Sequence, residues 1–382
     1  MPALLVASTF AAFCLAIALL FIQQAAPFAA LHVALAAGVM PLILGAITYF
    51  VPVLTRTRAP APAVWLLALC ALAAGWTAVA AFAVPAAPAL TAAAALAGFA
   101  AVSLLAWAVR RGALSIGRLH PGLHWYIAAL VCLTLALAAV IAMEQFPEQR
   151  LALRRLHLHL NTLGFVALAA VGTLQVLLPT TVRGQDGDAV KRLREDLKWA
   201  LGGAVLISIG AAWLPALAWA GLVLWAIPLV RLLLAWFGRF RDTIIAMHGA
   251  AVSLAAALTG FMLLLLSGAL HGSGVLQGSH AVPAYFLGFL LPLVTGAVTH
   301  LLPLWIRPGA HTRWHDRVRH GLGRYAGVRV VLFLSAGGFA ALGRTEGLFI
   351  GAAGLAMFVL QALHTLVTAR RAEPGFSRLL KK

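Results

Sequence analysis

Acidic residues are scarce in this sequence. The chain of 382 residues has ten Asp and Glu against 28 Lys and Arg. All ten lie in predicted loops, at predicted helix ends or in the C-terminal tail, at Glu144, Glu148, Asp186, Asp188, Glu195, Asp196, Asp242, Asp316, Glu346 and Glu373. A proton relay across a membrane uses ionisable side chains inside the membrane-spanning segments. Proton pumping is therefore not expected.

Cysteine is also rare. Cys14, Cys70 and Cys132 each lie inside an apolar run, and the chain has no C-x-x-C or C-x-x-C-H motif. The sequence therefore indicates neither a disulfide framework nor a covalently attached c-type haem. We interpret the three cysteines as small core residues.

Long polar stretches are missing too, because 63% of the residues are hydrophobic. A helix of about 20 apolar residues crosses the roughly 30 Å hydrocarbon core of a bilayer. We predict an all-α polytopic membrane protein with 12 transmembrane helices near residues 3–23, 29–53, 63–84, 88–109, 123–143, 156–179, 197–214, 216–236, 245–269, 281–305, 324–342 and 347–369. They form three four-helix arcs in one membrane domain over 1–382, with repeats at about 1–111, 120–240 and 243–371 and a basic cytoplasmic tail at 372–382.

Three of these segments share a fixed spacing of residues. From His159, the chain reaches Gly172 after 13 residues, Pro179 after 20 and Arg183 after 24. The same offsets connect His32 with Gly45, Pro52 and Arg56, and Pro283 with Gly296, Pro303 and Arg307. The copies lie 127 and then 124 residues apart. A repeat of this kind indicates an internal triplication.

The shared spacing has a physical meaning in a membrane. Twenty helical residues rise about 30 Å, so the first position and the proline lie at opposite faces. We expect the helix to end at the proline, whose nitrogen carries no hydrogen, and the arginine to lie among the head groups. The glycine in the middle is expected to let a neighbouring helix approach closely.

Basic residues give the expected orientation. The formal net charge is +18, and 22 of the 28 Lys and Arg fall in the connections after even-numbered helices or in the C-terminal tail. By the positive-inside rule, both termini are cytoplasmic in a multi-pass protein of a bacterial-type inner membrane. The placement of the basic residues on the predicted cytoplasmic side accounts for the positive net charge. We therefore expect the lipid bilayer as a partner, and no nucleic acid.

Five of the 13 histidines lie at the predicted outer ends of helices: His32, His157, His159, His271 and His280. An imidazole inside a membrane is costly unless it finds a partner. A single one is usually a satisfied core residue, but five at one depth favour a metal or haem site. The other eight are interpreted as interfacial or loop residues. Among these, His248 and His300 lie within helices and are kept, with His271, as further metal candidates.

The residues around the H-x-H motif suggest what it holds. The rings of His157 and His159 point about 200° apart around a helix, so one helix can serve two different centres. Arg154 and Arg155 precede the motif on the predicted outer side, against the positive-inside pattern. They either form salt bridges with nearby glutamates such as Glu148 or neutralise haem propionates, which a planar guanidinium pairs with well.

Two runs resemble a known family. The run H-x-H-x(3)-L-G-F-V-A…G…P at 157–179 and the run L-G-F…T-G-A-V-T-H-L-L-P at Leu287–Pro303 are similar to the haem- and copper-bearing helices of subunit I of heme-copper oxidases. The C-family enzymes, the nitric oxide reductases and the NnrS family are the nearest in pattern. The resemblance implies that the chain is a degenerate member of the heme-copper oxidase superfamily. It implies haem b as a cofactor, and copper as a second metal, since these families bind both. It also implies electron transfer or handling of nitric oxide or oxygen near the periplasmic face, with an electron donor or accessory subunit.

The match is incomplete at the ligand positions. His32 matches the family's helix-2 ligand of the low-spin haem, and His159 matches a helix-6 copper ligand by position, although the 157/159 doublet also resembles the helix-10 pair that holds two haems. Pro283 stands where the second axial histidine would stand, and His280 lies almost one turn earlier. Segment 197–214 has no histidine, so the usual copper pair and its tyrosine partner are missing. A working terminal oxidase is not expected, and an oxidoreductase activity stays open.

Two hypotheses follow from these residues. In the first, His32 and one of His280, His157 or His159 ligate a b-type haem whose propionates meet Arg154 and Arg155. In the second, the chain is a cofactor-free transporter or metal-handling protein whose histidines line a pathway. Transporters more often show two repeats with broken helices at the midplane, which favours the haem hypothesis.

Overall fold

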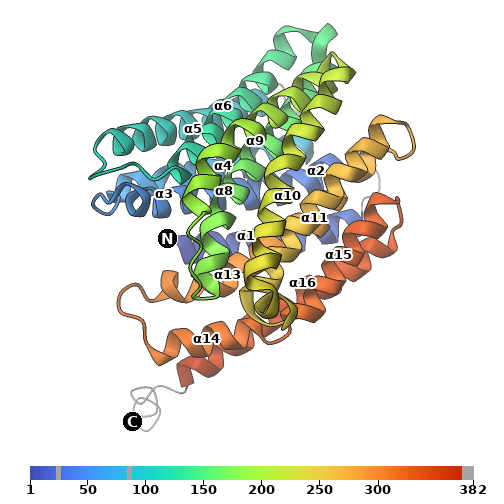
Figure 1. The fold of residues 1–382 in the computed structure, drawn as a ribbon. Coiled ribbons are helices and arrows are strands. Elements are labelled where there is room, and N and C mark those ends of the chain that lie inside the picture. Colours follow the sequence, from blue (N-terminus) through green and yellow to red (C-terminus); the bar gives the residue numbers. More distant parts are fainter. Residues whose placement is uncertain (23–26, 84–87, 372–382) are drawn as a thin grey trace. The chain divides into compact units, whose positions relative to one another are not determined.

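The computed structural model describes residues 1–22, 27–83 and 88–371 and shows only helices, turns and connecting segments in these ranges. Its first compact unit comprises Met1–Val176 and Gln185–Leu232. This unit contains α1 (Pro2–Ile22), α2 (Pro27–His32), η1 (Val33–Val39), α3 (Met40–Thr55), α4 (Pro62–Ala83), α5 (Ala89–Ala113), α6 (Gly122–Gln145), η2 (Pro147–Gln149), α7 (Arg150–His159), η3 (Leu160–Val166), most of α8 (Ala167–Thr181), α9 (Ala189–Ala212) and the first half of α10 (Pro215–Ile245) (Figure 1).

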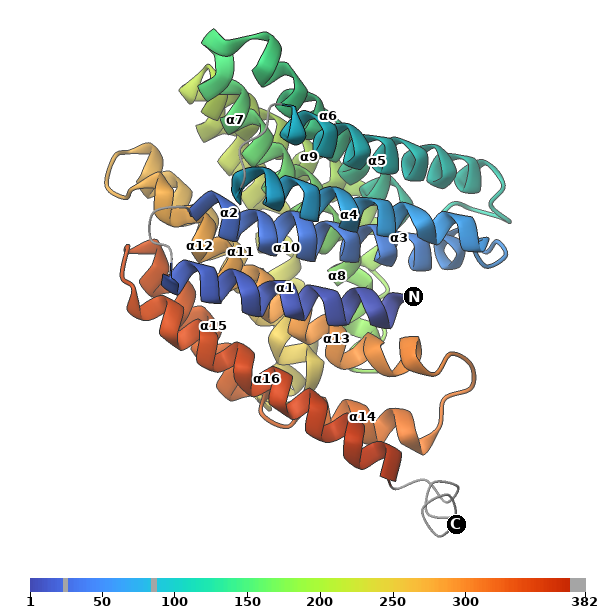
Figure 2. The same cartoon turned by 180° about the vertical axis from the view of Figure 1, so that it is seen from behind.

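The second unit comprises Leu177–Gly184 and the chain from Leu233 onward. It contains the end of α10, α11 (Gly249–Gly272), η4 (Gly278–His280), α12 (Ala281–Tyr285), η5 (Phe286–Leu290), α13 (Leu291–Ile306), α14 (Arg313–Gly323), α15 (Ala326–Ala341) and α16 (Glu346–Arg371). Within this unit α15 and α16 run side by side (Figure 2). The predicted tail at 372–382 lies outside the described residues.

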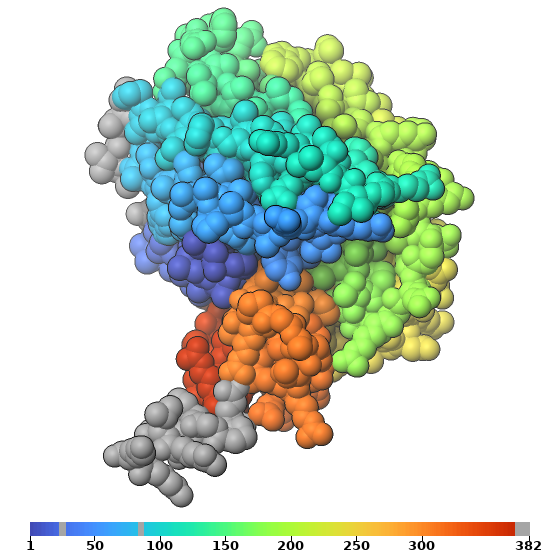
Figure 3. All heavy atoms as spheres, turned by 90° about the vertical axis from the view of Figure 1, so that its left-hand side faces the viewer, coloured from blue at the N-terminus to red at the C-terminus, as the bar shows by residue number. Residues whose placement is uncertain are grey.

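Ten described segments are long and apolar enough to cross a membrane, so the prediction of an all-α, multi-pass membrane protein is confirmed. The other two predicted segments, 197–214 and 324–342, are also helical and correspond to α9 and α15. The first turns of α9 carry several charges, and α15 has only 16 residues. In the first unit, α4 and α5 expose apolar side chains such as Leu66, Phe99 and Val102, as contact with lipid tails requires. These two helices form part of the surface seen in Figure 3.

Each of the three repeat helices is interrupted by a π-helix at an equivalent position. The π-helices are η1, η3 and η5. By the repeat spacing, η1 and η3 cover equivalent residues, and η5 ends at the residue equivalent to their last residues. Pro41 and Pro292 follow the first and third, where the missing N–H removes a bond to the carbonyl four residues earlier and favours a wider turn. Leu168 stands there in the second repeat, so tertiary packing sustains the π-helix without proline.

The mid-helix glycines are sites of close helix approach, as predicted. A Cβ added to Gly172 would lie 2.6 Å from the Cβ of Trp125 on α6, and one added to Gly296 would lie 2.9 Å from the Cβ of Ser253 on α11. Gly45 faces α1 too, although the nearest atom there is the terminal Cδ1 of the flexible Leu5 side chain. In every repeat the glycine therefore packs against the first helix of that repeat.

The helices do not end at the repeat prolines, which corrects the prediction. They continue past Pro52 and Pro179 to Thr55 and Thr181, so each proline lies in the last turn and leaves the carbonyl four residues earlier without its helical N–H partner. Arg56 and Arg183 then both adopt φ 53°. The next N–H groups, of Thr57 and Gly184, donate to the carbonyls of Pro52 and Pro179 at 3.0 and 2.9 Å. In the first two repeats the arginine four residues after the proline thus forms a left-handed C-cap, whereas Arg307 in the third has φ −128°.

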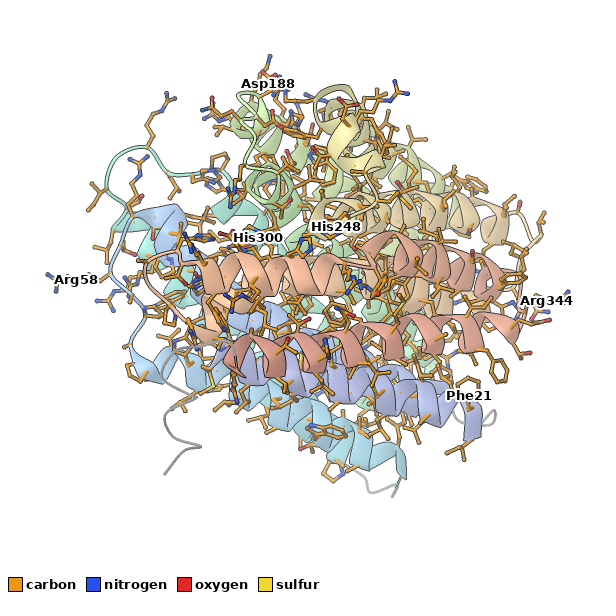
Figure 4. All side chains as sticks on the ribbon, turned by 90° about the horizontal axis from the view of Figure 1, so that it is seen from below. Phe21, Arg58, Asp188, His248, His300 and Arg344 are labelled. Atoms are coloured by element: carbon orange, nitrogen blue, oxygen red, sulfur yellow. The ribbon has the colours of Figure 1, made fainter. Side chains whose placement is uncertain are left out.

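Figure 4 labels residues far apart within each unit. In the first unit, Phe21 and Arg58 lie at opposite ends (Figure 4). In the second unit, Arg344 lies at one end, away from His248 and His300 (Figure 4). The orientation expected from the basic residues stays a prediction.

Candidate functional site

Two of the predicted ligands, His32 and His157, lie together in the first unit. Their ring centroids are 6.5 Å apart and the ring planes differ by only 5°. His32 is the last residue of α2, directly before η1, and His157 lies on α7, shortly before η3. Figure 2 shows α2 and α7 at the same end of this unit. The π-helices therefore follow both imidazoles, as π-helices often do at functional sites.

The protonation of both rings follows from their hydrogen bonds. His32 Nδ1 lies 2.7 Å from the carbonyl oxygen of Phe28, and His157 Nδ1 lies 2.9 Å from that of Ala136. Because a carbonyl oxygen only accepts, Nδ1 carries the proton in each ring. A neutral imidazole of this tautomer keeps the Nε2 lone pair for a metal, and a backbone carbonyl on Nδ1 is the usual support of a metal-bound histidine.

The surroundings of the pair are aromatic, basic and apolar. The ring of Phe82 lies 4.6 Å from that of His32. The guanidinium of Arg154 lies 5.5 Å from the centre of the Phe28 ring, one helical turn before His32. This places Arg154 close to the histidine pair, whereas Nη1 of Arg155 donates to the carbonyl of Ala211 on α9 at 3.5 Å.

The salt bridges considered for the two outer arginines are not formed. Among the described residues, the ion pairs include neither Glu144 nor Glu148. Arg154 instead contacts an aromatic ring and Arg155 a backbone carbonyl. Both guanidinium groups thus keep hydrogen-bond donors for a further acceptor.

His159 has a different environment from His157. Its Nδ1 lies 2.8 Å from the carbonyl oxygen of Arg155 on its own helix. The repeat spacing equates His159 with His32, yet the ring beside His32 is that of His157. The H-x-H motif thus offers its two rings to different surroundings, as its geometry predicts.

The remaining outer histidines belong to the second unit. The ring of His271 stands over Gly278, with Nδ1 3.1 Å from the carbonyl oxygen of Leu276. The ring of His280 packs against Gly343, a glycine with φ 73° in the turn before α16. In the described part of this unit, neither ring is in ring contact with another histidine.

His248 and His300 lie at the other end of the second unit. His248 is exposed at the start of α11, and its ring centroid is 5.0 Å from that of His320 on α14. His300 is buried on α13, and its carbonyl accepts a hydrogen bond from Arg319 Nε at 3.3 Å. The cationic Arg319 therefore contacts the backbone of His300, and a metal-binding role of His300 stays a prediction.

The ligand set favours one kind of metal centre. Over the described ranges, no group of three or more His, Cys, Asp and Glu side chains could hold a metal ion. A closed zinc site needs four protein ligands, whereas haem brings four nitrogen ligands and takes one or two axial ones. Two imidazoles on opposite sides of a metal, with bonds of about 2.0 Å, have ring centres roughly 6 Å apart. The centroid separation of 6.5 Å between His32 and His157 is close to this value.

Three features of the site were missed by sequence reasoning. Asn161 donates to the His157 carbonyl at 3.1 Å and lies 3.5 Å from the His157 Nε2 atom. Its position four residues after His157, on the same helix face, was the available signal. Phe82 and the Ala136 carbonyl come from distant helices and carried no signal in the sequence.

No protein-family profile and no curated protein sequence matches the chain. The likeness to heme-copper oxidase subunits thus rests on the motifs alone.

Proposed function

We propose that the chain is a membrane haem protein in which His32 and His157 are the axial ligands of a b-type haem. The observation that carries the proposal is the pair of parallel imidazoles, 6.5 Å apart, each with its Nδ1 proton held by a backbone carbonyl. A bound haem supplies a one-electron couple. Because two imidazoles leave no open position on the iron, the pair supports electron transfer more than binding of nitric oxide or oxygen.

The neighbouring residues have defined roles in this proposal. The carbonyls of Phe28 and Ala136 fix the ring orientation of the two histidines. Phe82 provides an apolar wall beside His32. Arg154, next to Phe28, is the cation placed to pair with a propionate, and Arg155 is a weaker candidate because it is engaged with α9.

The same proposal covers topology. We propose twelve membrane-spanning helices in three four-helix arcs, with α9 and α15 as the seventh and eleventh, both termini cytoplasmic, and the histidine pair near the periplasmic face of a bacterial-type inner membrane. Support comes from the recurrence of the π-helix and of the glycine contact in all three repeats. Since α9 has no histidine, the proposal includes neither a copper site there nor terminal oxidase activity.

An absorption spectrum of the purified full chain, supplied with haem, oxidised and then reduced, tests the function. We expect a six-coordinate low-spin haem spectrum that His32→Ala and His157→Ala each lose or convert to a five-coordinate form. His159→Ala and His311→Ala are matched controls and should keep the wild-type spectrum. If the wild type binds no haem, or if both test variants keep its spectrum, the transporter hypothesis replaces this one.

A further inference from the structure

The short helix α14 carries a stripe of basic side chains on one exposed face. Arg313, Arg317, His320 and Arg324, at the end of the helix, follow one another at steps of four, three and four residues, and all are exposed. Such steps place side chains on one line along a helix. The opposite face, with Trp314, Val318 and Leu322, is buried. We refer to the four exposed residues as the basic stripe.

Nothing in the described chain neutralises the basic stripe. The only acidic residue of α14 is Asp316, whose carboxylate already lies 3.0 Å from Arg183 and 3.4 Å from His311. None of the ion pairs among the described residues includes Arg313, Arg317 or Arg324. The stripe therefore keeps an uncompensated positive field toward its surroundings.

An apolar groove begins where the stripe ends. It has a volume of about 310 Å³ and is lined by Met247, Arg324, Tyr325, Gly327, Val328 and Val331. The guanidinium of Arg324 lies 5.2 Å from the centre of the Tyr325 ring, so an arginine and an amphipathic aromatic ring stand together at the mouth. Val328 and Val331 on α15 are 54% and 56% exposed although both are apolar.

The backbone holds stripe and groove in a fixed relation. The buried Arg329 of α15 donates from Nη2 to the carbonyl of Leu322 on α14 at 2.9 Å. Gln361 of α16 donates to the carbonyl of Gly321 at 2.9 Å. The end of α14 is thus fastened to both α15 and α16, and α14 lies beside α16 (Figures 1 and 2). A ligand that bridges the stripe and the groove meets a preorganised surface.

We propose that this surface binds an anionic phospholipid. Its phosphate meets Arg324 and the neighbouring cations of the basic stripe, and an acyl chain lies in the groove along Val328 and Val331. Clusters of arginine at a membrane surface attract anionic head groups, and aromatic rings favour the interface. An acidic protein segment would satisfy the stripe but not the exposed valines of an apolar helix, so the lipid accounts for both halves of the surface.

Lipid retention by the full chain in detergent tests the proposal. Phosphatidylglycerol and phosphatidylcholine are titrated separately, and bound lipids are counted by native mass spectrometry. We expect preferential binding of phosphatidylglycerol, weakened roughly fivefold by Arg324→Gln because a surface arginine contributes about that factor. Val328→Trp fills the groove without a charge change and should also abolish the preference. Arg58→Gln, which removes an exposed arginine from the first unit, is the matched control and should bind as the wild type does.

Several outcomes would overturn this proposal. These are equal binding of the two lipids, equal effects of Arg324→Gln and Arg58→Gln, or a preference that survives Val328→Trp. Full displacement of the lipid by inorganic phosphate alone would define a site for free phosphate instead. Tight binding of soluble polyglutamate without any lipid preference would make the stripe a protein-docking face.

Discussion

The first and third repeat helices, Phe28–Thr55 and Gly278–Ile306, contain the same backbone features around different chemistry. Both have a π-helix, a proline directly after it and a glycine that seats the first helix of the repeat. The first has His32 near its start, with its ring centroid 6.5 Å from that of His157, whereas the third has Pro283 at the equivalent position. The scaffold is therefore repeated, and the candidate ligands are not.

This difference separates what builds the helix from what gives it a function. If the histidine produced the π-helix, the third repeat would lack one. Instead, packing against a neighbour occurs in both cases. A Cβ on Gly75 of α4 would collide with the Ala36 carbonyl of η1, and one on Gly260 of α11 with the Gly288 carbonyl of η5. The interruption therefore does not depend on the histidine, and a ligand can be placed on it or omitted.

The largest effect is expected from breaking the scaffold itself. Gly172→Ala puts a methyl group 2.6 Å from the Cβ of Trp125, a position that only a helix shift can relieve. We expect a loss of about 1–3 kcal/mol in stability, the usual cost of overpacking. Thermal unfolding of the purified chain measures it.

The matched control for this prediction is Gly98→Ala on α5. No atom lies within 4 Å of the Cβ added there, so the change should be neutral or slightly stabilising, since alanine is the better helix former. Equal stability of the two variants would show that the repeat glycines do not seat the neighbouring helices and that the shared scaffold has another origin.

Much of the scaffold could be predicted from the sequence, because apolar length and residue spacing are local signals. All twelve predicted segments are helical, and the repeat glycines mark close helix contacts. The π-helices could not be predicted in this way, because an extra residue in one turn leaves the apolar composition of a buried helix unchanged. The prediction that the helices end at the proline was wrong, because the helix end depends on the left-handed residue that follows, which is Arg56 or Arg183.

The site was predicted only in part. The histidines were found as polar residues in apolar surroundings, but the partner of His32 was left open among three candidates, since pairing across helices depends on how α2 and α7 pack. Helix α14 was missed because its charges were read as a basic connection. The apolar residues Trp314, Val318 and Leu322, at steps of four, were the signal of its buried face.

A smaller effect is expected where the repeats differ at their C-caps. Arg56 has φ 53°, a region in which glycine is favoured, whereas Arg307 precedes Pro308 and has φ −128°. Arg56→Gly should therefore raise stability by a few tenths to about 1 kcal/mol, because the left-handed conformation no longer strains a side chain. Arg307→Gly should lower it slightly, because glycine only adds freedom to the unfolded chain. A gain in both variants, or in neither, in a thermal unfolding series would contradict this distinction.

The smallest effect is expected on the pH dependence of stability, through a histidine close to Arg56, the C-cap residue of the first repeat helix. His120 lies in the loop between α5 and α6, and its Nδ1 accepts a hydrogen bond from the Gly122 N–H at 3.1 Å. Burial lowers the pKa of His120 from its ordinary value of 6.5, and repulsion by the nearby Arg56 lowers the pKa further. The folded chain thus binds this proton less readily than the unfolded chain, so folding stability falls as pH drops below about 6.5.

Arg56→Gly removes the repulsion but not the burial, so the pKa of His120 should rise part of the way back, and the loss of stability between about pH 6.5 and pH 5 should become shallower. The stability of wild type, Arg56→Gly and Arg58→Gly across that range measures this slope, with Arg58→Gly as the control that should follow the wild type. An unchanged slope in Arg56→Gly would show that Arg56 and His120 are not coupled, and a steeper slope would reverse the sign assigned to their interaction.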